Sequence, residues 1–257
     1  MLENLFLKEE EEMTPESLVY IFFLTAVISV ISIAITKYLL KFEQGLLSVF
    51  IISLACAYPI IKFLKEEARE EEYLANKETE ESLLMRHFKE IGLYLSFFFA
   101  VVFVFALAYY QLPPEFFSIQ LDTIGSITGN ATQGGLFWTI TINNLRIFSL
   151  TFLLSFLVSA GMILILVWNA SVFGVFLAKT SRTVHNLPLL FTAYFPHGAI
   201  EVAAYIVAGI AGLLVSTHFE DIKNEDSSVT IKIFEDVSFL VLIGIGLVFL
   251  GAAIEVI

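Results

Sequence analysis

Residues 147–178 read IFSLTFLLSFLVSAGMILILVWNASVFGVFLA and contain no Asp, Glu, Lys or Arg. About 20 apolar residues are enough for a helix to cross the hydrocarbon core of a bilayer, so this run is longer than one crossing. Five more stretches without these charged residues are each long enough for one crossing. They are residues 17–36, 44–61, 91–114, 202–219 and 237–254. Six such runs predict an all-α fold, a polytopic transmembrane helical bundle of about six helices.

The composition also indicates a membrane protein. Of the 257 residues, 58% are hydrophobic and 16% are charged, and the mean hydropathy is +0.84, whereas a soluble domain averages roughly 45–50% apolar and about 25% charged residues. The net charge of −12 excludes a broad basic surface and so a nucleic-acid partner. The single cysteine, Cys56, excludes a disulfide framework and a Cys-based metal site. We expect one membrane domain, residues 1–257, that crosses the cell membrane several times and has the lipid bilayer as its first partner.

The apolar runs and the residues that flank them predict the positions of the membrane helices. These helices cover 17–40, 44–64, 91–112, 144–178, 196–216 and 237–257. The fourth is too long for one straight helix, because its length would reach roughly 50 Å at about 1.5 Å per residue. We therefore predict a broken fourth helix, with the break near Trp168-Asn169 or at Gly174.

Two connections between the predicted helices contain many of the polar residues. Residues 65–90 are rich in acidic and basic side chains, and we interpret them as a charged cytoplasmic helical hairpin with a solvated surface. An arm that docks a partner is the alternative. Residues 113–143 are polar but weakly charged, and we predict an extracytoplasmic loop there. Lys and Arg are more numerous on the side of the N-terminus, which by the positive-inside rule places both termini in the cytoplasm.

Four polar side chains lie within the predicted helices, where ionisable groups are costly and often functional. They are His197, Glu201, Glu255 and Asn169. His197 and Glu201 are four residues apart and so share one helix face, and the helix directions place all four groups near the cytoplasmic side. We therefore expect a polar cluster. One interpretation is a hydrogen-bonded network that organises the helix core. The other is a metal or proton site, with His197, Glu201 and Glu255 as candidate ligands for Zn²⁺ and no other cofactor.

Small residues continue the helix faces that carry these polar groups. They are Ala204, Ala208 and Gly212 after Glu201, and Gly244 and Gly251 in line with Glu255. Small residues at four-residue spacing let membrane helices approach closely. We therefore predict these five positions as helix-packing sites within the chain, with a homo-oligomer joined through the same faces as a further hypothesis.

The sequence FPHGAIEVAA at residues 195–204 resembles the hallmark segment of the stage II sporulation protein M family. Two further stretches fit this resemblance. They are the motif of Asn143, Asn144 and Arg146, followed by the long apolar run to Gly174, and the segment from Gly251 to Glu255. The resemblance covers about residues 140–257, which makes 144–257 a family-like core. It implies an integral membrane protein; in sporulating bacteria the namesake is a membrane scaffold that recruits peptidoglycan-degrading partners during engulfment.

The function that these features suggest is not catalytic. The leading hypothesis is an integral membrane scaffold or assembly factor, with other membrane or envelope proteins as partners and the cluster of His197, Glu201 and Glu255 organising its helices. The sequence contains no HExxH, Walker A or GxSxG motif, which favours a protein that is not an enzyme. The alternative is a transporter or an intramembrane metal-dependent enzyme that uses the same three residues as its site.

Overall fold

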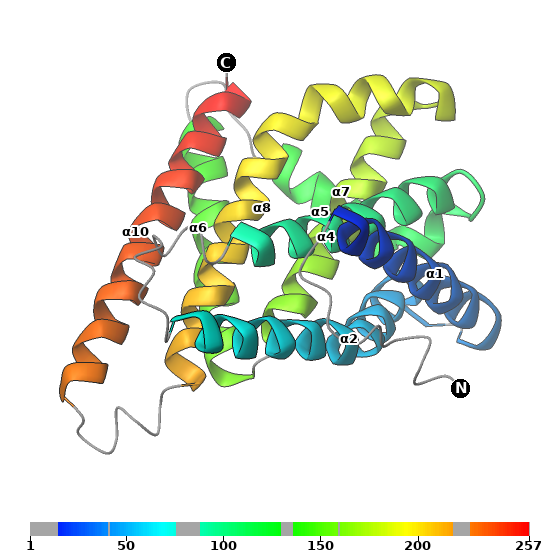
Figure 1. Cartoon of the computed structure of the whole chain (residues 1–257). Helices are drawn as coiled ribbons and strands as arrows, with labels where there is room; N and C mark the ends of the chain where they lie inside the picture. Colours follow the sequence, from blue (N-terminus) through cyan, green and yellow to red (C-terminus); the bar gives the residue numbers. More distant parts are fainter. Residues whose placement is uncertain are drawn as a thin grey trace, which may run out of the picture.

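The computed structural model describes residues 15–40, 42–75, 88–129, 136–158, 160–217 and 227–256. All the regular structure in these ranges is helical (Figure 1), which confirms the predicted all-α fold. The α-helices are α1 (Pro15–Leu39), α2 (Gln44–Ala75), α4 (Phe88–Tyr109), α5 (Ser118–Gly129), α6 (Leu136–Leu157), α7 (Gly161–Ser181), α8 (Leu187–Thr217) and α10 (Ser227–Val256). Two short 3-10 helices, η2 (Pro114–Phe117) and η3 (Val184–Asn186), precede α5 and α8.

Six segments of this helical structure are long and apolar enough to cross a membrane, which confirms the polytopic prediction. They are Glu16–Leu39, Glu90–Tyr109, Leu136–Leu157, Gly161–Ser181, Val184–Ser216 and Ile233–Val256. The predicted helix 44–64 is not among these six, and the part of α2 whose side chains are described, Gln44–Ile60, is a shorter apolar helix. The total is still six because the predicted fourth helix, 144–178, is divided between two full-length helices, α6 and α7.

The break in the long apolar run lies between α6 and α7, so its predicted position is wrong. α6 ends at Leu157 and α7 begins at Gly161, whose N–H donates to the Val158 carbonyl at 2.6 Å. A Cβ atom at Gly161 would lie 2.3 Å from the Leu154 carbonyl oxygen, which is too close for any other residue. The break therefore depends on a close backbone contact that glycine alone permits.

The residues predicted at the break lie inside α7 and have other contacts there. The side-chain amide of Asn169 donates to the Ile165 carbonyl at 2.8 Å, so it is satisfied within its own helix. Gly174 faces α4, where a Cβ atom would lie 2.5 Å from the Val102 carbonyl oxygen. Neither residue opens the helix, and Gly174 instead lets α7 pack closely on α4.

The two polar connections contain more helix than a simple loop. Within residues 113–143 the chain forms η2 and α5 and then begins α6, so this segment is largely helical. Phe116 and Phe117 in η2 are buried, and burial of these aromatic side chains anchors the segment to the core. Within residues 65–90, α2 continues to Ala75 and α4 begins at Phe88; the remainder of the predicted hairpin lies outside the described residues.

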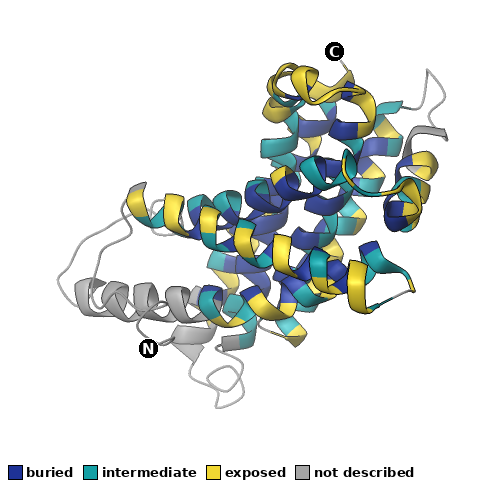
Figure 2. Cartoon of the chain, turned by 90° about the vertical axis from the view of Figure 1, so that its right-hand side faces the viewer, coloured by how far each residue is buried: buried dark blue, intermediate teal, exposed yellow. Residues whose placement is uncertain are grey.

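α7 joins two groups of helices. α6, α8 and α10 lie side by side in Figure 1, and α1, α2, α4 and α5 form the other group. α7 contacts α2, α4 and α5 of one group and α6 and α8 of the other. Buried positions concentrate where the helices meet, and exposed positions face outward (Figure 2).

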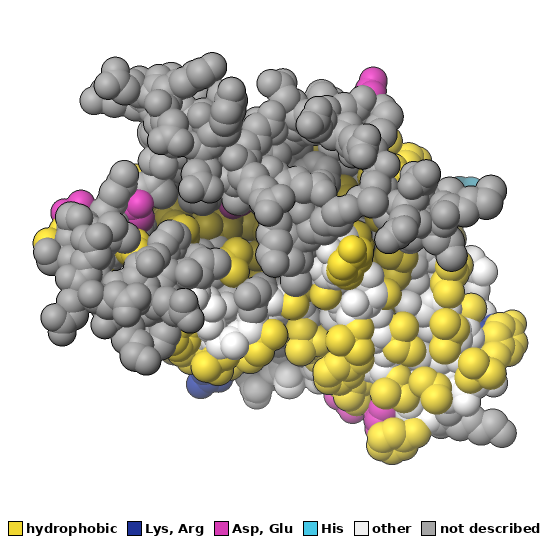
Figure 3. Space-filling model, turned by 60° about the horizontal axis from the view of Figure 1, so that its bottom comes forward, with side chains coloured by type: hydrophobic (Ala, Val, Ile, Leu, Met, Phe, Trp, Pro, Cys, Tyr) yellow, Lys and Arg dark blue, Asp and Glu magenta, His cyan; other side chains and the backbone are white. Residues whose placement is uncertain are grey.

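The outer faces of the helices are themselves apolar. Phe23 of α1, Leu54 of α2 and Leu242 of α10 are all exposed. Hydrophobic side chains cover much of the described surface in Figure 3, with few charged ones among them. Helices that are apolar on all sides are typical of a chain surrounded by lipid, so the surface agrees with the six candidate spans.

α8 bends in the part of the helix that contains Pro196 (Figure 1). A proline inside a helix removes a hydrogen-bond donor and clashes with the preceding turn. Before the bend, the rings of Phe191 and Phe195 lie 5.7 and 5.1 Å from the ring of Phe99 in α4. After the bend, α8 packs against α6 and α10. The bend therefore directs the segment that contains Glu201 into the α6–α8–α10 group.

Candidate functional site

A polar contact joins α6 to α8 in the interior of the molecule. The side-chain amide of Asn144 in α6 donates to Glu201 Oε1 in α8 at 2.5 Å. The Tyr205 hydroxyl, one turn further along α8, donates to Asn144 Oδ1 at 2.8 Å. Asn144 is 4% exposed and Tyr205 is 3% exposed. The Asn144 carboxamide is thus bonded at both ends to α8, and we call Asn144, Glu201, Tyr205 and Gly251 the clasp.

α10 completes the clasp through Gly251. A Cβ atom at Gly251 would lie 2.7 Å from Glu201 Cγ, so the absence of a side chain lets α10 lie directly on the glutamate. Glu255 follows one turn later and is exposed. The glutamate therefore contacts groups from α6 and α10 while belonging to α8.

The predicted cluster of four polar residues is not formed. His197 follows the bend in α8, and its ring packs edge-on against Tyr194, with 5.4 Å between the ring centroids. Asn169 bonds within α7, whereas Glu201 is bonded to Asn144 of α6. His197 and Glu201 lie on adjacent turns of α8, but their side chains have different neighbours.

The predicted metal site of His197, Glu201 and Glu255 is also wrong, because the three side chains do not converge on one point. Within the ranges that the structure describes, no group of three or more His, Cys, Asp and Glu side chains is arranged to hold a metal ion. Four-residue spacing indicates a shared helix face, but ligation also needs the side chains to converge. His197 is directed to an aromatic neighbour and Glu255 is exposed.

The asparagine–arginine motif lies in the middle of α6 and does not open a helix. Asn144 is a member of the clasp, and Asn143 donates to Asn144 Oδ1 at 3.4 Å. Arg146 is exposed. The role of Asn144 and the involvement of Tyr205 were missed in the sequence because the helix was expected to begin at residue 144. An Asn in the middle of a span would have been the signal.

The small residues predicted for packing lie at contacts within the α6–α8–α10 group. Ala204 and Ala208 of α8 are fully buried. A Cβ atom at Gly212 would lie 2.3 Å from the Phe152 carbonyl oxygen of α6, and one at Gly244 would lie 2.3 Å from the Phe148 ring. These faces are occupied within the chain, so they are not available to join a second copy.

The arrangement of the clasp can hold three helices in register. Hydrogen bonds between membrane helices contribute about 0.6 kcal/mol on average and up to about 1.7 kcal/mol each. The clasp adds two such bonds to the close packing at Gly251, Gly212 and Gly244. The clasp is therefore a structural contact whose polar groups are hydrogen-bonded to one another.

The helices of the clasp lie in the part of the chain that matches a known family. The family model described as stage II sporulation protein M matches residues 93–257, a range that starts in α4 and includes α6, α7 and α8 completely. No curated protein and no solved structure matches the chain. The match covers more than half of the chain and contains every residue of the clasp. The chain belongs to the stage II sporulation protein M family.

Proposed function

We propose that this chain is an integral membrane scaffold or assembly factor whose α6–α8–α10 group is held in one arrangement by the clasp. The observation that carries the proposal is that the polar groups of the clasp are bonded to one another. Asn144 uses both ends of its carboxamide on Glu201 and Tyr205. A scaffold needs a rigid surface, and we propose other membrane or envelope proteins as the partners that assemble on it.

The geometry supports a scaffold better than a transporter. A transporter that used Glu201 would need this group to exchange its partners for a solute or for water. In the clasp, Glu201 is bonded to Asn144 and covered by Gly251. The cavities beside α7 are lined by other residues. The proposal therefore gives Glu201 a structural role.

Glu201→Gln separates the two functions because it removes the ionisable group and keeps the oxygen that accepts from Asn144. A scaffold with this change should remain folded and should form assemblies of the wild-type size. These assemblies are measured by native electrophoresis after chemical crosslinking in host membranes. A transporter that uses Glu201 would instead keep its fold and lose solute flux in proteoliposomes, which would contradict the proposal.

Glu201→Leu is the matched variant that breaks the clasp. It leaves the buried amide of Asn144 without its acceptor, at a cost of about 1–3 kcal/mol. We expect a lower unfolding temperature in detergent and a loss of the large assemblies. A wild-type chain that migrates alone after crosslinking would contradict a scaffold, whatever the variants do.

We also propose that both termini lie on the same side of the membrane, because six crossings return the chain to the side on which it began. The prediction of cytoplasmic termini depended on counting 44–64 as a crossing. Eight of the 14 Lys and Arg residues lie between Lys37 and Lys89. With α1 and α4 as consecutive crossings, the positive-inside rule favours a cytoplasmic position for this connection and an extracytoplasmic position for both termini.

A further inference from the structure

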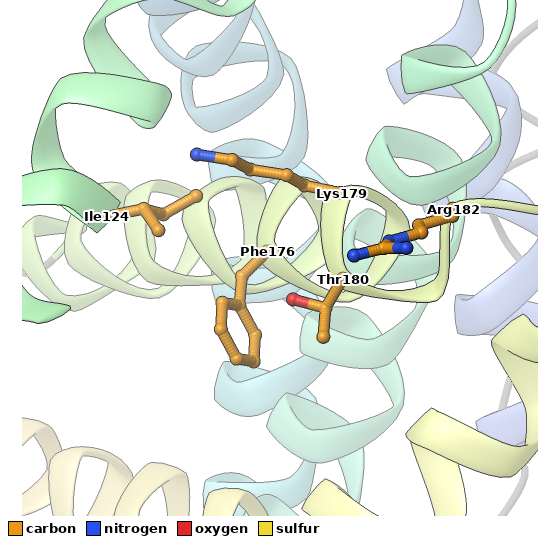
Figure 4. Close-up of a pocket in the computed structure, with 5 residues that line it drawn as sticks. All are labelled: Ile124, Phe176, Lys179, Thr180 and Arg182. Atoms are coloured by element: carbon orange, nitrogen blue, oxygen red, sulfur yellow. The ribbon is translucent and has the colours of Figure 1, made fainter.

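A cavity of about 310 Å³ lies at the end of α7 (Figure 4). It is lined by Ile124 of α5 and by Phe176, Lys179, Thr180 and Arg182. Two of these residues are cationic and none is acidic, although the whole chain has a net charge of −12. Neither Lys179 nor Arg182 has an ion-pair partner in the described part of the chain. The cavity therefore presents two positive charges that no described residue pairs with.

The backbone at Arg182 indicates that its side chain matters. Arg182 follows the last turn of α7 with φ 58° and ψ −24°, in the left-handed region. Glycine is favoured at such a position because it has no Cβ penalty. Interaction with the helix dipole does not require Arg182, since Lys179 already supplies a cation in the last turn. The presence of arginine instead of glycine at this position is therefore better explained by a ligand of its guanidinium group.

The cavity lies where a membrane helix ends. α7 is the candidate span Gly161–Ser181, so Arg182 follows directly after the apolar segment. In Figure 4 the Lys179 side chain extends along α7 toward Ile124, with Phe176 one turn before Thr180. The cavity thus combines cationic groups with apolar ones at the position expected for the boundary between lipid and water.

A second cavity beside the same turns of α7 is wholly apolar. It has a volume of about 240 Å³, and its lining includes Leu177 of α7 and Leu187 and Phe191 of α8. Leu177 is adjacent in the chain to Phe176 of the cationic cavity. A molecule with an anionic head and an apolar body would find suitable surroundings for both parts at this end of α7.

We propose that the cationic cavity binds the phosphate of an anionic phospholipid. Lys179 and Arg182 hold the phosphate oxygens, since guanidinium and ammonium groups form strong charge-assisted hydrogen bonds with phosphate. The Thr180 hydroxyl supplies a further donor, and Ile124 and Phe176 contact the apolar part of the lipid. This site does not depend on the scaffold function.

Arg182→Gly tests the site because it separates lipid binding from folding. Glycine relieves the left-handed backbone, so the unfolding temperature of the lipid-free chain in detergent should stay the same or rise. Binding of phosphatidylglycerol to the full chain, measured by native mass spectrometry, should weaken about 5-fold for one lost charge. Lys179→Gln together with Arg182→Gly should weaken it about 25-fold.

Arg146→Gln is the matched control, because Arg146 is an exposed cation on α6 that does not line the cavity. It should leave phosphatidylglycerol binding unchanged. Equal binding of phosphatidylcholine and phosphatidylglycerol by the wild type, or equal losses in the Arg146 and Arg182 variants, would overturn the proposal. Stabilisation by inorganic phosphate that depends on Arg182, without any preference for phosphatidylglycerol, would assign the site to a soluble ligand and would also overturn it.

Discussion

At the scale of single residues, the clasp depends on a buried carboxamide that is bonded at both ends. Asn144 donates to Glu201 and accepts from Tyr205, and its place in the middle of α6 leaves few other partners. A polar group in a membrane span is costly unless it is bonded. The three side chains therefore stabilise the fold as a unit, and loss of one partner affects the others.

Tyr205→Phe should lower the free energy of unfolding by about 0.6–1.7 kcal/mol, the range for hydrogen bonds between membrane helices. The change removes the hydroxyl that donates to Asn144 Oδ1 and keeps the aromatic ring. Unfolding of the detergent-solubilised chain by a denaturing detergent measures the effect. Tyr58→Phe is the control, since Tyr58 is 72% exposed. Equal effects of the two changes would show that the hydroxyl bond contributes nothing.

At the scale of helices, glycine positions determine how closely the elements approach. The contact of Gly212 with the Phe152 carbonyl of α6 and that of Gly251 with Glu201 are shorter than a side chain permits. Close approach of this kind provides packing energy in a membrane, where lipid is as apolar as the side chains. The positions of α6, α8 and α10 relative to one another therefore rest on a few glycines.

Gly212→Ala should destabilise the chain by about 1–3 kcal/mol, the usual cost of an overpacked contact. The added Cβ would lie 2.3 Å from the Phe152 carbonyl oxygen, so α6 and α8 must separate. The unfolding temperature in detergent measures the change. Gly246→Ala in α10 is the matched control, because a Cβ there meets nothing within 4 Å. Alanine should be neutral or mildly stabilising at that position, and equal losses at both sites would refute the packing argument.

At the scale of the whole molecule, the six spans determine where the connections lie. The proposed topology counts the six candidate spans, in which the long run is divided between α6 and α7 and α2 is not a crossing. In the topology proposed above, the Lys- and Arg-rich connection before α4 lies on the opposite side of the membrane from both termini. Orientation is therefore a property of the complete set of crossings, and a change in one of them reverses it.

Cysteine labelling tests this topology. In a Cys56→Ala background, which lacks native cysteine, Glu16→Cys and Val256→Cys should both react with a membrane-impermeant maleimide added outside intact cells. Tyr38→Cys, at the other end of α1, should react only after the membrane is permeabilised. The physical reason is that six crossings leave both termini on one side. Labelling of Glu16→Cys and Val256→Cys from opposite sides would show that α2 also crosses.

The fold class was predictable from the sequence because hydropathy is a local property. Each apolar run, such as 17–36 or 237–254, contains enough residues to cross a bilayer whatever the rest of the chain does. The helical class follows from any one of these runs, and the polytopic arrangement follows from their number. The break at Gly161 did not follow, since its cause is a contact with the Leu154 carbonyl. In the sequence, Trp168, Asn169 and Gly174 are as plausible as Gly161 for the position of the break. Only the packing of the helices distinguishes these positions.

The sequence by itself determined that this chain is a multi-pass helical membrane protein and that Glu201 is a polar residue placed where burial is costly. Tertiary structure decided which groups meet that residue. The His197 ring packs against Tyr194 of its own helix, whereas the groups around Glu201 are Asn144, 57 positions away, and Gly251 of α10. Helix spacing identifies which residues share a face, but the partner of a face depends on how distant helices pack, and no local pattern contains that information.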